Sequence, residues 1–429
     1  MSRERRTLVV LFLVALGLRL AWVLSVSRDG FAENDSLFYH VVASNISHGG
    51  VYGSIFGEPS ARWPPGWPAI LAVLYRVFGE HPVAGEVFNA FVGAITVPLL
   101  YLLVKPHFGR RVALIAAVML CVMPGPILWT DMLVTETVFT FLLVLFFLLV
   151  MRASPTWKWA AALGLYVGLV AMVRSEAIIW LTVPAVLWWR TAGWRVALPR
   201  MAAAGAVFLL ALVPWAIRNT NAMGSFVPLS TNAGETLYAG HNPNANGMQN
   251  HPSEALTASF GTPNTAEWEV AWSKGLQREA ISWAVRHPVQ EVTLIPKKIL
   301  ALNRGDSYAF DWLNMQPFPT LGPTWTTYIS VVADFAWFTL LALTLVGVLA
   351  LGRAVWRQRL MVAIATMFVT ILVVYGFVYY GNYRYRLPYE PLMMVVAALV
   401  VDRAWTGLRM ARDADAIVAD ESPAEPAAG

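Results

Sequence analysis

The sequence has few charged residues and almost no cysteine. Only 13% of its 429 residues are Asp, Glu, Lys or Arg, about half the ~25% found in soluble globular proteins. Hydrophobic residues make up 57% and the mean hydropathy is +0.55, which excludes an ordinary soluble protein and a largely disordered chain. The one cysteine, Cys121, has no partner within the chain, so it forms no intrachain disulfide and no cysteine metal cluster. The formal charge of +5 comes from basic residues dispersed among short loops, which argues against a nucleic-acid partner.

Apolar runs occupy most of the chain. A helix needs about 20 apolar residues to cross the hydrocarbon core of a bilayer. Such runs fall near residues 8–26, 83–104, 112–129, 133–151, 159–173, 177–189, 198–217, 327–351, 361–380 and 388–402. No small-residue cleavage site follows the first run, so we expect a retained helix rather than a removed signal peptide. The sequence therefore predicts an all-α polytopic membrane protein with about ten transmembrane helices.

The positions of Lys and Arg predict the orientation of the chain. If the N-terminus is cytoplasmic, alternate connections carry the clusters of basic residues and hold more than half of the 31 Lys and Arg residues. These clusters lie at 3–6, 105–111, 152–158, 190–200, 353–359 and 403–412. We therefore expect both termini in the cytoplasm and the irregular polar sequence at the outer face of the cytoplasmic (inner) membrane.

Four parts of the chain follow from this pattern. They are an N-terminal transmembrane core at 1–217, an extracytoplasmic segment at 218–326, C-terminal transmembrane helices at 327–402, and a cytoplasmic tail at 403–429. The tail ends in acidic, Ala-rich and Pro-containing sequence, and we expect it to be disordered.

Short helices are expected outside the membrane. The first outer loop, residues 28–82, contains helical patterns at 35–47 and 69–78 that are too short to span, which is typical of interfacial helices. Segment 218–326 begins polar and becomes helical in pattern from 265, so we expect a small extracytoplasmic helical cap.

Charged side chains gather at the outer ends of the predicted spans. The acids are Glu33, Asp35, Asp131, Glu136 and Glu176, and the basic residues are Arg62, Arg174, Arg218, Arg384 and Arg386. A charge beside a membrane span is costly, so such residues are candidates for function. Carboxylates accept protons or bind cations, and guanidinium groups grip phosphate bidentately. The pattern predicts an acidic centre ringed by phosphate-binding arginines.

These residues also have structural explanations. Asp35 suits the cap of the helix that follows it, and Glu136 would oppose the positive end of a helix. Arg174 and Glu176 would form a local ion pair. The two arginines of the last corner are harder to explain in this way, because residues two apart cannot both face lipid.

Four outer motifs together resemble a known family. They are Asn34-Asp-Ser-Leu-Phe-Tyr-His40, Arg62-Trp-Pro-Pro-Gly-Trp-Pro68, Pro214-Trp-Ala-Ile-Arg-Asn219 and Arg384-Tyr-Arg-Leu-Pro388. In order and spacing they resemble the GT-C membrane glycosyltransferases, especially the bacterial relatives of the protein O-mannosyltransferases and the aminoarabinose transferases (glycosyltransferase family 39-like). The resemblance runs over residues 8–402. It implies transfer of a sugar from a polyprenyl monophosphate to an acceptor hydroxyl, usually with inversion, at the outer face of the membrane.

The resemblance also implies roles for individual residues. Asp35 matches the catalytic aspartate of the first loop and is expected to be the general base, and the second acidic position matches Asp131 or Glu136. The donor phosphate is expected at Arg62, Arg218, Arg384 and Arg386. Substrate contacts are expected from Glu33, Tyr39, His40 and Asn219. The protein mannosyltransferases have Glu directly after the aspartate, whereas this chain has Ser36 there.

A metal and the second substrate are left open by the sequence. Some relatives use a divalent cation, for which Asp35, Asp131 and His40 are candidate ligands, but a hard cation needs more oxygen ligands than these supply. The donor sugar, a hexose or a pentose, and the acceptor, a glycolipid, polysaccharide or protein, are not specified.

A transporter or flippase of lipid-linked sugars is the alternative from another class. Transporters place ionisable residues near the bilayer midplane and often contain inverted repeats. Here the charges lie at one side of the spans and no internal repeat is visible. We therefore favour the enzyme.

Overall fold

The computed structural model describes residues 2–26, 35–314 and 321–420. Helices form every regular element of these residues, and the β pairing among them is a single bridge between Gly53 and Pro59. The chain is a helical membrane protein, as its composition predicts.

Six helical stretches of the described residues are long and apolar enough to cross a membrane. They are α1 (Arg3–Val26), α4 (Pro82–Val122), α9 (Trp194–Met223), α15 (Pro323–Ala350), Arg359–Val378, and Tyr383–Leu408. The fifth joins α17 (Arg359–Val373) to a π-helical turn at Val374–Val378, and the sixth joins α18 (Tyr383–Arg386) and a 3-10 turn to α19 (Glu390–Asp420).

Three predicted runs form shorter helices. These are α6 (Glu136–Arg152), α7 (Trp157–Ala171), and α8 (Thr182–Ala192) with the 3-10 turn Ser175–Leu181 before it. Every predicted run is therefore helical in the described chain, while the number of about ten crossings stays a prediction.

Helix α4 contains the predicted span 83–104 and most of the predicted span 112–129, which continues beyond the end of α4. It runs for 41 residues, and Gly109 interrupts it with a φ of 81°. Asn89, in the first part of this helix, donates from Nδ2 to the carbonyl of Met132, which lies beyond the end of the helix, at 2.9 Å. A straight 41-residue helix would be about 60 Å long, so this contact requires the chain to turn back at Gly109.

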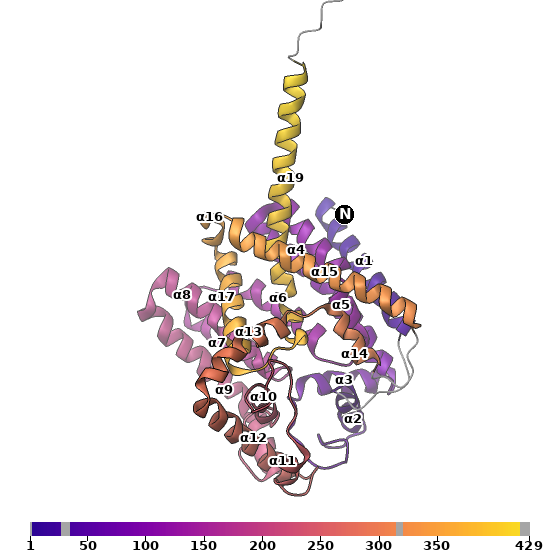
Figure 1. The fold of residues 1–429 in the computed structure, drawn as a ribbon, viewed down its shortest axis with the longest axis vertical. Coiled ribbons are helices and arrows are strands. Elements are labelled where there is room, and N and C mark those ends of the chain that lie inside the picture. The colour runs from indigo at the N-terminus through magenta and orange to yellow at the C-terminus, as the bar shows by residue number, and fades with distance from the viewer. Residues whose placement is uncertain (1, 27–34, 315–320, 421–429) are drawn as a thin grey trace, which may run out of the picture.

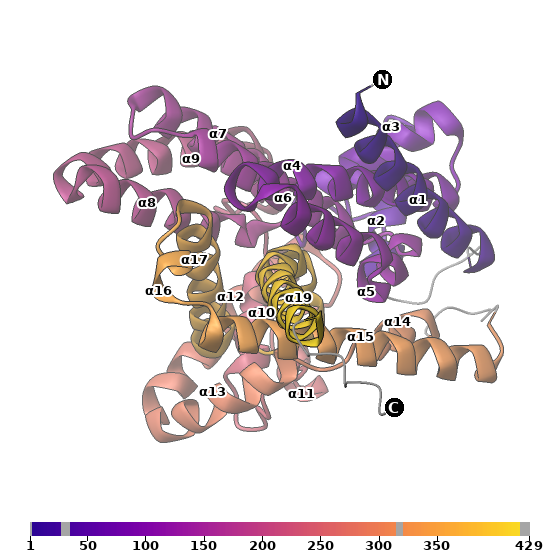
Figure 2. The same ribbon diagram turned by 90° about the horizontal axis from the view of Figure 1, so that it is seen from above.

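The remaining helices lie in the first outer loop, the segment after α9, or short connections. They are α2 (Asp35–Ser47), α3 (Gly66–Phe78), α5 (Pro124–Leu128), α10 (Ala233–Gly240), α11 (Glu254–Ala258), α12 (Ala266–Arg286), α13 (Pro288–Leu302), α14 (Ala309–Asn314) and α16 (Arg353–Trp356). Helices α2 and α10–α12 gather at the end of the molecule opposite the start of α1 and the end of α19 (Figure 1). From above, α19 lies centrally, with α7–α9 on one side and α1 and α3 on the other (Figure 2).

The helices continue past the expected part boundaries. The boundaries at 217/218, 326/327 and 402/403 fall inside α9, α15 and α19. The tail expected to be disordered from 403 is helical as far as Asp420, because α19 continues through Gly407 and contains no proline after its second residue.

The cap is tied to the first outer loop by one carboxylate. Glu269 of α12 accepts hydrogen bonds from the Ser60 hydroxyl at 2.7 Å, the Ala61 backbone N–H at 2.9 Å and the Thr231 hydroxyl at 2.5 Å. The three donor residues are almost fully buried. Since buried donors without an acceptor are costly, Glu269 fixes the cap against residues 60–61.

We predict that Glu269→Ala destabilises the cap by about 2 kcal/mol, because it leaves several buried donors without their acceptor. Thermal unfolding of the detergent-solubilised protein, followed by tryptophan fluorescence, measures the loss. Glu254→Ala, at an exposed acid of α11, is the matched control. Equal transition temperatures for the two variants would contradict this role of Glu269.

Candidate active site

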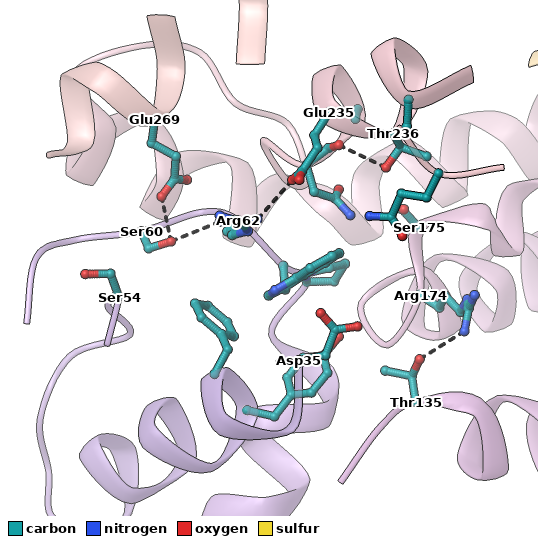
Figure 3. A pocket seen from close by; sticks show the side chains of 18 of the residues that line it. Asp35, Ser54, Ser60, Arg62, Thr135, Arg174, Ser175, Glu235, Thr236 and Glu269 are labelled. Atoms are coloured by element: carbon teal, nitrogen blue, oxygen red, sulfur yellow. Dashed lines mark hydrogen bonds and ion pairs between the residues drawn. The ribbon is translucent and has the colours of Figure 1, made fainter. Parts of the chain in front are cut away.

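A cavity of about 580 Å³ lies between the first outer loop, the cap and the corners between membrane helices. Its walls come mainly from segments 35–39, 54–64, 173–176, 232–269 and 379–385. Figure 3 shows Asp35 on one side of this space, with Arg62, Glu235 and Glu269 across from it. The cavity thus joins parts of the chain separated by up to about 350 residues.

Asp35 is the first residue of α2 and lines the cavity. Buried side chains on one face of α2, among them Tyr39 and Val42, pack the helix and fix its first turn. The Asp35 carboxylate is 23% exposed, and its Oδ2 lies 2.9 Å from Arg384 Nη1. Asp35 is therefore an accessible acid with one side held by a guanidinium.

Arg384 connects Asp35 to a deeper acid. Its Nε and Nη2 lie 2.9 and 2.8 Å from Glu136 Oε1, while its Nη1 faces Asp35. Glu136 is completely buried and also accepts from Arg174 Nη1 at 2.9 Å. The structure therefore places Glu136 behind the cavity wall, where it is paired with two arginines. A catalytic acid would be expected to line the cavity, and Glu136 is not among the lining residues.

Arg174 belongs to the same network and lines the cavity. Its Nε lies 2.7 Å from Glu176 Oε1, and Glu176 Oε2 accepts from the Tyr375 hydroxyl at 2.5 Å. The local pair expected between Arg174 and Glu176 is present, yet both side chains also reach the site.

Only one of the two arginines in the last corner enters the cavity. Arg386 instead pairs with Asp306 at 2.6 Å and Glu390 at 2.9 Å, and its guanidinium lies 3.4 Å from the centre of the Trp337 ring. Residues two apart on a helix point about 200° away from each other. Because α18 is helical, Arg384 and Arg386 face opposite directions, and Arg386 does not line the site predicted for it.

The arginine and asparagine at the end of α9 have structural contacts. Arg218 Nη1 donates to the Ser60 carbonyl at 2.7 Å and its Nη2 to the Tyr52 carbonyl. Asn219 is buried and donates to the carbonyls of Val227 and Leu229. Arg218 was predicted to bind the donor phosphate and Asn219 to bind substrate, but both lie outside the lining and hold the loops that shape it.

Of the other predicted substrate contacts, Tyr39 lines the cavity. Burial, with a further contribution from the Asp35 carboxylate, raises the pKa of Tyr39 well above its ordinary value, so its hydroxyl stays protonated. His40 faces away and forms a 2.9 Å hydrogen bond with the Tyr75 hydroxyl. Glu33 lies outside the described residues.

The proposed metal ligands do not converge. Asp131 belongs to the 3-10 turn Trp129–Asp131, is 7% exposed and is not part of the lining. Neither candidate for the second acidic position, Asp131 or Glu136, therefore lines the cavity. No group of three or more His, Cys, Asp and Glu side chains in the described part of the chain is placed to hold a metal ion.

Several lining residues come from the cap and were not predicted. Glu235 lines the cavity and lies 2.9 Å from Arg62, which also lines it as predicted. The other lining residues of the cap include Asn264, Trp268 and Glu269. The sequence contained no spacing signal for them, because loops around short helices bring them to the wall. Their concentration in the one polar, Asn-rich outer segment was the available indication.

The arrangement combines two chemical capacities. An accessible carboxylate can take a proton from a hydroxyl, and the guanidinium groups of Arg384 and Arg174 can hold an anion. Both capacities lie within one cavity whose wall includes the start of the last membrane stretch.

Comparison with known families gives a partial match. Residues 62–217 match the family model of dolichyl-phosphate-mannose-protein mannosyltransferase. No curated protein matches the chain.

Solved structures share the fold. The oligosaccharyltransferase of Archaeoglobus fulgidus in its apo form is 15% identical with a TM-score of 0.55, over 97% of this chain and 52% of that one. The same archaeal enzyme with an inhibitory peptide and a dolichol-phosphate is 13% identical with a TM-score of 0.54, over 99% and 52%. ArnT from Cupriavidus metallidurans bound to undecaprenyl phosphate is 14% identical with a TM-score of 0.42, over 94% and 79%. The chain spans about half the length of the archaeal enzyme. The family match and the shared fold confirm the predicted resemblance to GT-C membrane glycosyltransferases.

We predict that Glu136→Gln destabilises the protein by about 3 kcal/mol or more, because it removes the buried charge shared by two guanidinium groups. Asp35→Asn is expected to cost less than about 1 kcal/mol, since that carboxylate is partly exposed. Denaturant unfolding in detergent compares the two variants. Equal losses would show that Glu136 is not the supporting acid of the site.

Proposed function

We propose that this chain, which resembles the GT-C membrane glycosyltransferases in fold, transfers a sugar from a polyprenyl-monophosphate donor to an acceptor hydroxyl. The observation that carries the proposal is the ion pair of Asp35 and Arg384 on the wall of the cavity, where the last membrane stretch begins. The sugar is a hexose or a pentose.

Asp35 acts as the general base. As the acceptor oxygen attacks the anomeric carbon, Asp35 takes the hydroxyl proton, which requires an approach of about 2.6–3.2 Å. The bond from the anomeric carbon to the phosphate oxygen breaks at the same time. Attack from the side opposite this bond inverts the configuration of the sugar.

Arg384 and Arg174 stabilise the departing phosphate. Charge develops on the phosphate as the glycosidic bond breaks, and preorganised donors lower the energy of that transition state. Glu136 holds both guanidinium groups in place from behind the wall. Because Arg384 also contacts Asp35, one side chain links the base to the leaving group.

The donor reaches this site from the membrane. Its polyprenyl tail belongs in hydrocarbon, whereas its phosphate and sugar need a polar site at the membrane surface. The dolichol-phosphate bound by the archaeal oligosaccharyltransferase of the same fold supports this donor class. With the basic loops in the cytoplasm, the cavity faces the outside of the inner membrane.

We predict that Asp35→Asn lowers kcat for sugar transfer by about 10²–10⁴-fold, the usual contribution of a positioned base. The assay is transfer from tritiated undecaprenyl-phosphate sugars by the full chain in lipid nanodiscs. Glu254→Gln makes the same acid-to-amide change at an exposed position and is expected to be unaffected. Full transfer activity in the Asp35 variant would refute the assignment of the base.

We predict that Arg384→Lys weakens the binding of undecaprenyl phosphate about tenfold, because lysine keeps the charge but loses the planar, bidentate contacts. Competition with a fluorescent undecaprenyl phosphate in nanodiscs measures the affinity. Arg190→Lys, at an exposed position of α8, is the control. Unchanged affinity in Arg384→Lys would place the phosphate elsewhere.

A further inference from the structure

The cavity has an outer half formed by the first outer loop and the cap. We define the outer half as the lining residues within 54–64 and 232–269. It lies across from Asp35, and Figure 3 shows Arg62, Glu235 and Glu269 on this side. If the donor phosphate binds at Arg384 and Arg174, the outer half is the space left for the second substrate.

The charges of the outer half are already paired within the protein. Arg62 is the arginine of its lining, and its Nη2 lies 2.9 Å from Glu235 Oε2. The other oxygen of Glu235 lies 3.8 Å from His251 Nδ1. Glu269 accepts three hydrogen bonds from the protein itself. An anionic acceptor would compete with Glu235 for Arg62 and face two carboxylates, so this surface disfavours phosphorylated or acidic acceptors.

An aromatic ring in a fixed orientation is available on the same wall. Trp268 lines the cavity, and its ring stacks on Trp272 with centroids 5.2 Å apart and planes 21° apart. Its indole N–H donates to the Thr257 carbonyl at 3.4 Å, and its backbone N–H is capped by the Thr265 hydroxyl. These contacts hold the indole in one orientation.

Neutral hydrogen-bonding groups line the same cavity as this ring. Gln249 and Asn264 both line the cavity, and each side-chain amide can donate and accept. Asn264 has a φ of +69°, in the left-handed region, and is the one non-glycine residue of the described chain with positive φ. Asparagine tolerates this conformation at a modest cost, and a turn of this kind places residue 264 on the wall immediately before α12.

We propose that the acceptor is a neutral carbohydrate whose terminal ring packs on Trp268 while its hydroxyls bind the amides of Gln249 and Asn264. A pyranose ring has an apolar C–H face that suits an indole, and its hydroxyls donate and accept like the amides. An acceptor hydroxyl then gives its proton to Asp35, its oxygen bonds to the anomeric carbon, and the polyprenyl phosphate leaves. This inference rests on the proposed function, because it names the acceptor of that transfer.

The first experiment compares acceptor classes with the wild-type chain in nanodiscs and tritiated undecaprenyl-phosphate sugars. The acceptors are a neutral mannose oligosaccharide, the same oligosaccharide with a phosphate monoester, and a peptide rich in Ser and Thr. We expect the neutral oligosaccharide to be used at least about tenfold better, in kcat/KM, than the other two. Preference for the phosphorylated oligosaccharide or the peptide overturns the proposal.

Variants then test the residues. Trp268→Ala is expected to raise the KM for the oligosaccharide about tenfold with a smaller effect on kcat. Trp268→Phe keeps an aromatic ring and should have a KM between those of the wild type and Trp268→Ala. Asn264→Gly removes the amide while relaxing the left-handed backbone, so it should raise the KM without loss of thermal stability. Trp194→Ala, at an exposed tryptophan that begins α9, is the control. An unchanged KM in both the Trp268→Ala and Asn264→Gly variants overturns the proposal.

The charge argument has its own test. Glu235→Gln frees Arg62, so we expect it to improve kcat/KM for the phosphorylated oligosaccharide relative to the neutral one by several-fold. A ratio equal to that of the wild type contradicts the argument that Glu235 excludes anionic acceptors.

Failure of this inference differs from failure of the proposed function. Saturation-transfer NMR measures oligosaccharide binding to wild type and Trp268→Ala without any donor. If donor is consumed but the neutral oligosaccharide neither binds nor accepts sugar, the acceptor inference fails and the transferase function stands. If no donor is consumed with any acceptor, the transferase function fails, and Trp268-dependent binding still decides whether the outer half holds a carbohydrate.

Discussion

The site depends on one buried negative charge. Glu136 has no exposed surface, and its carboxylate is held between the guanidinium groups of Arg174 and Arg384. A buried charge of this kind is tolerated only when it is paired and hydrogen-bonded. It therefore fixes where the two arginines point, and through Arg384 it also fixes the position of Asp35. Glu136, a candidate catalytic acid by its sequence position, lies outside the cavity lining and is paired with two arginines that face the cavity.

The same constraint explains how distant segments form one wall. The first turn of α2, the start of α6, the turn after α7 and the short helix α18 each contribute one charged residue to this network. The cap closes the other side through Glu269, whose oxygens satisfy buried donors of the first loop. The first turn of α2 and the corners at Arg174 and Arg384 thus provide one side of the cavity, and the rest of the first outer loop and the cap provide the other.

Much of the fold could be predicted from composition and hydrophobic runs. All ten apolar runs are helical. A membrane offers no water to hydrogen-bond the backbone, so an apolar segment within it has to pair its own N–H and C=O groups, as a helix does. The roles of individual charged residues were less predictable. Arg386 and Asp131 occur at corners that the sequence predicts to be at the outer face, yet a helical turn in one case and a 3-10 turn in the other place them off the cavity wall. Arg218 and Asn219 shape the wall from behind by holding loop carbonyls.

The sequence by itself determined the membrane class, the helical content and the resemblance to GT-C glycosyltransferases. These properties follow from local composition and from motifs of a few residues. Only the tertiary structure decided which charges meet, because ion pairs such as Asp35 with Arg384 join residues far apart in the chain, and their geometry depends on how helices turn and pack. It also decided that Glu235 neutralises Arg62, since that contact forms only when the cap lies on the first loop.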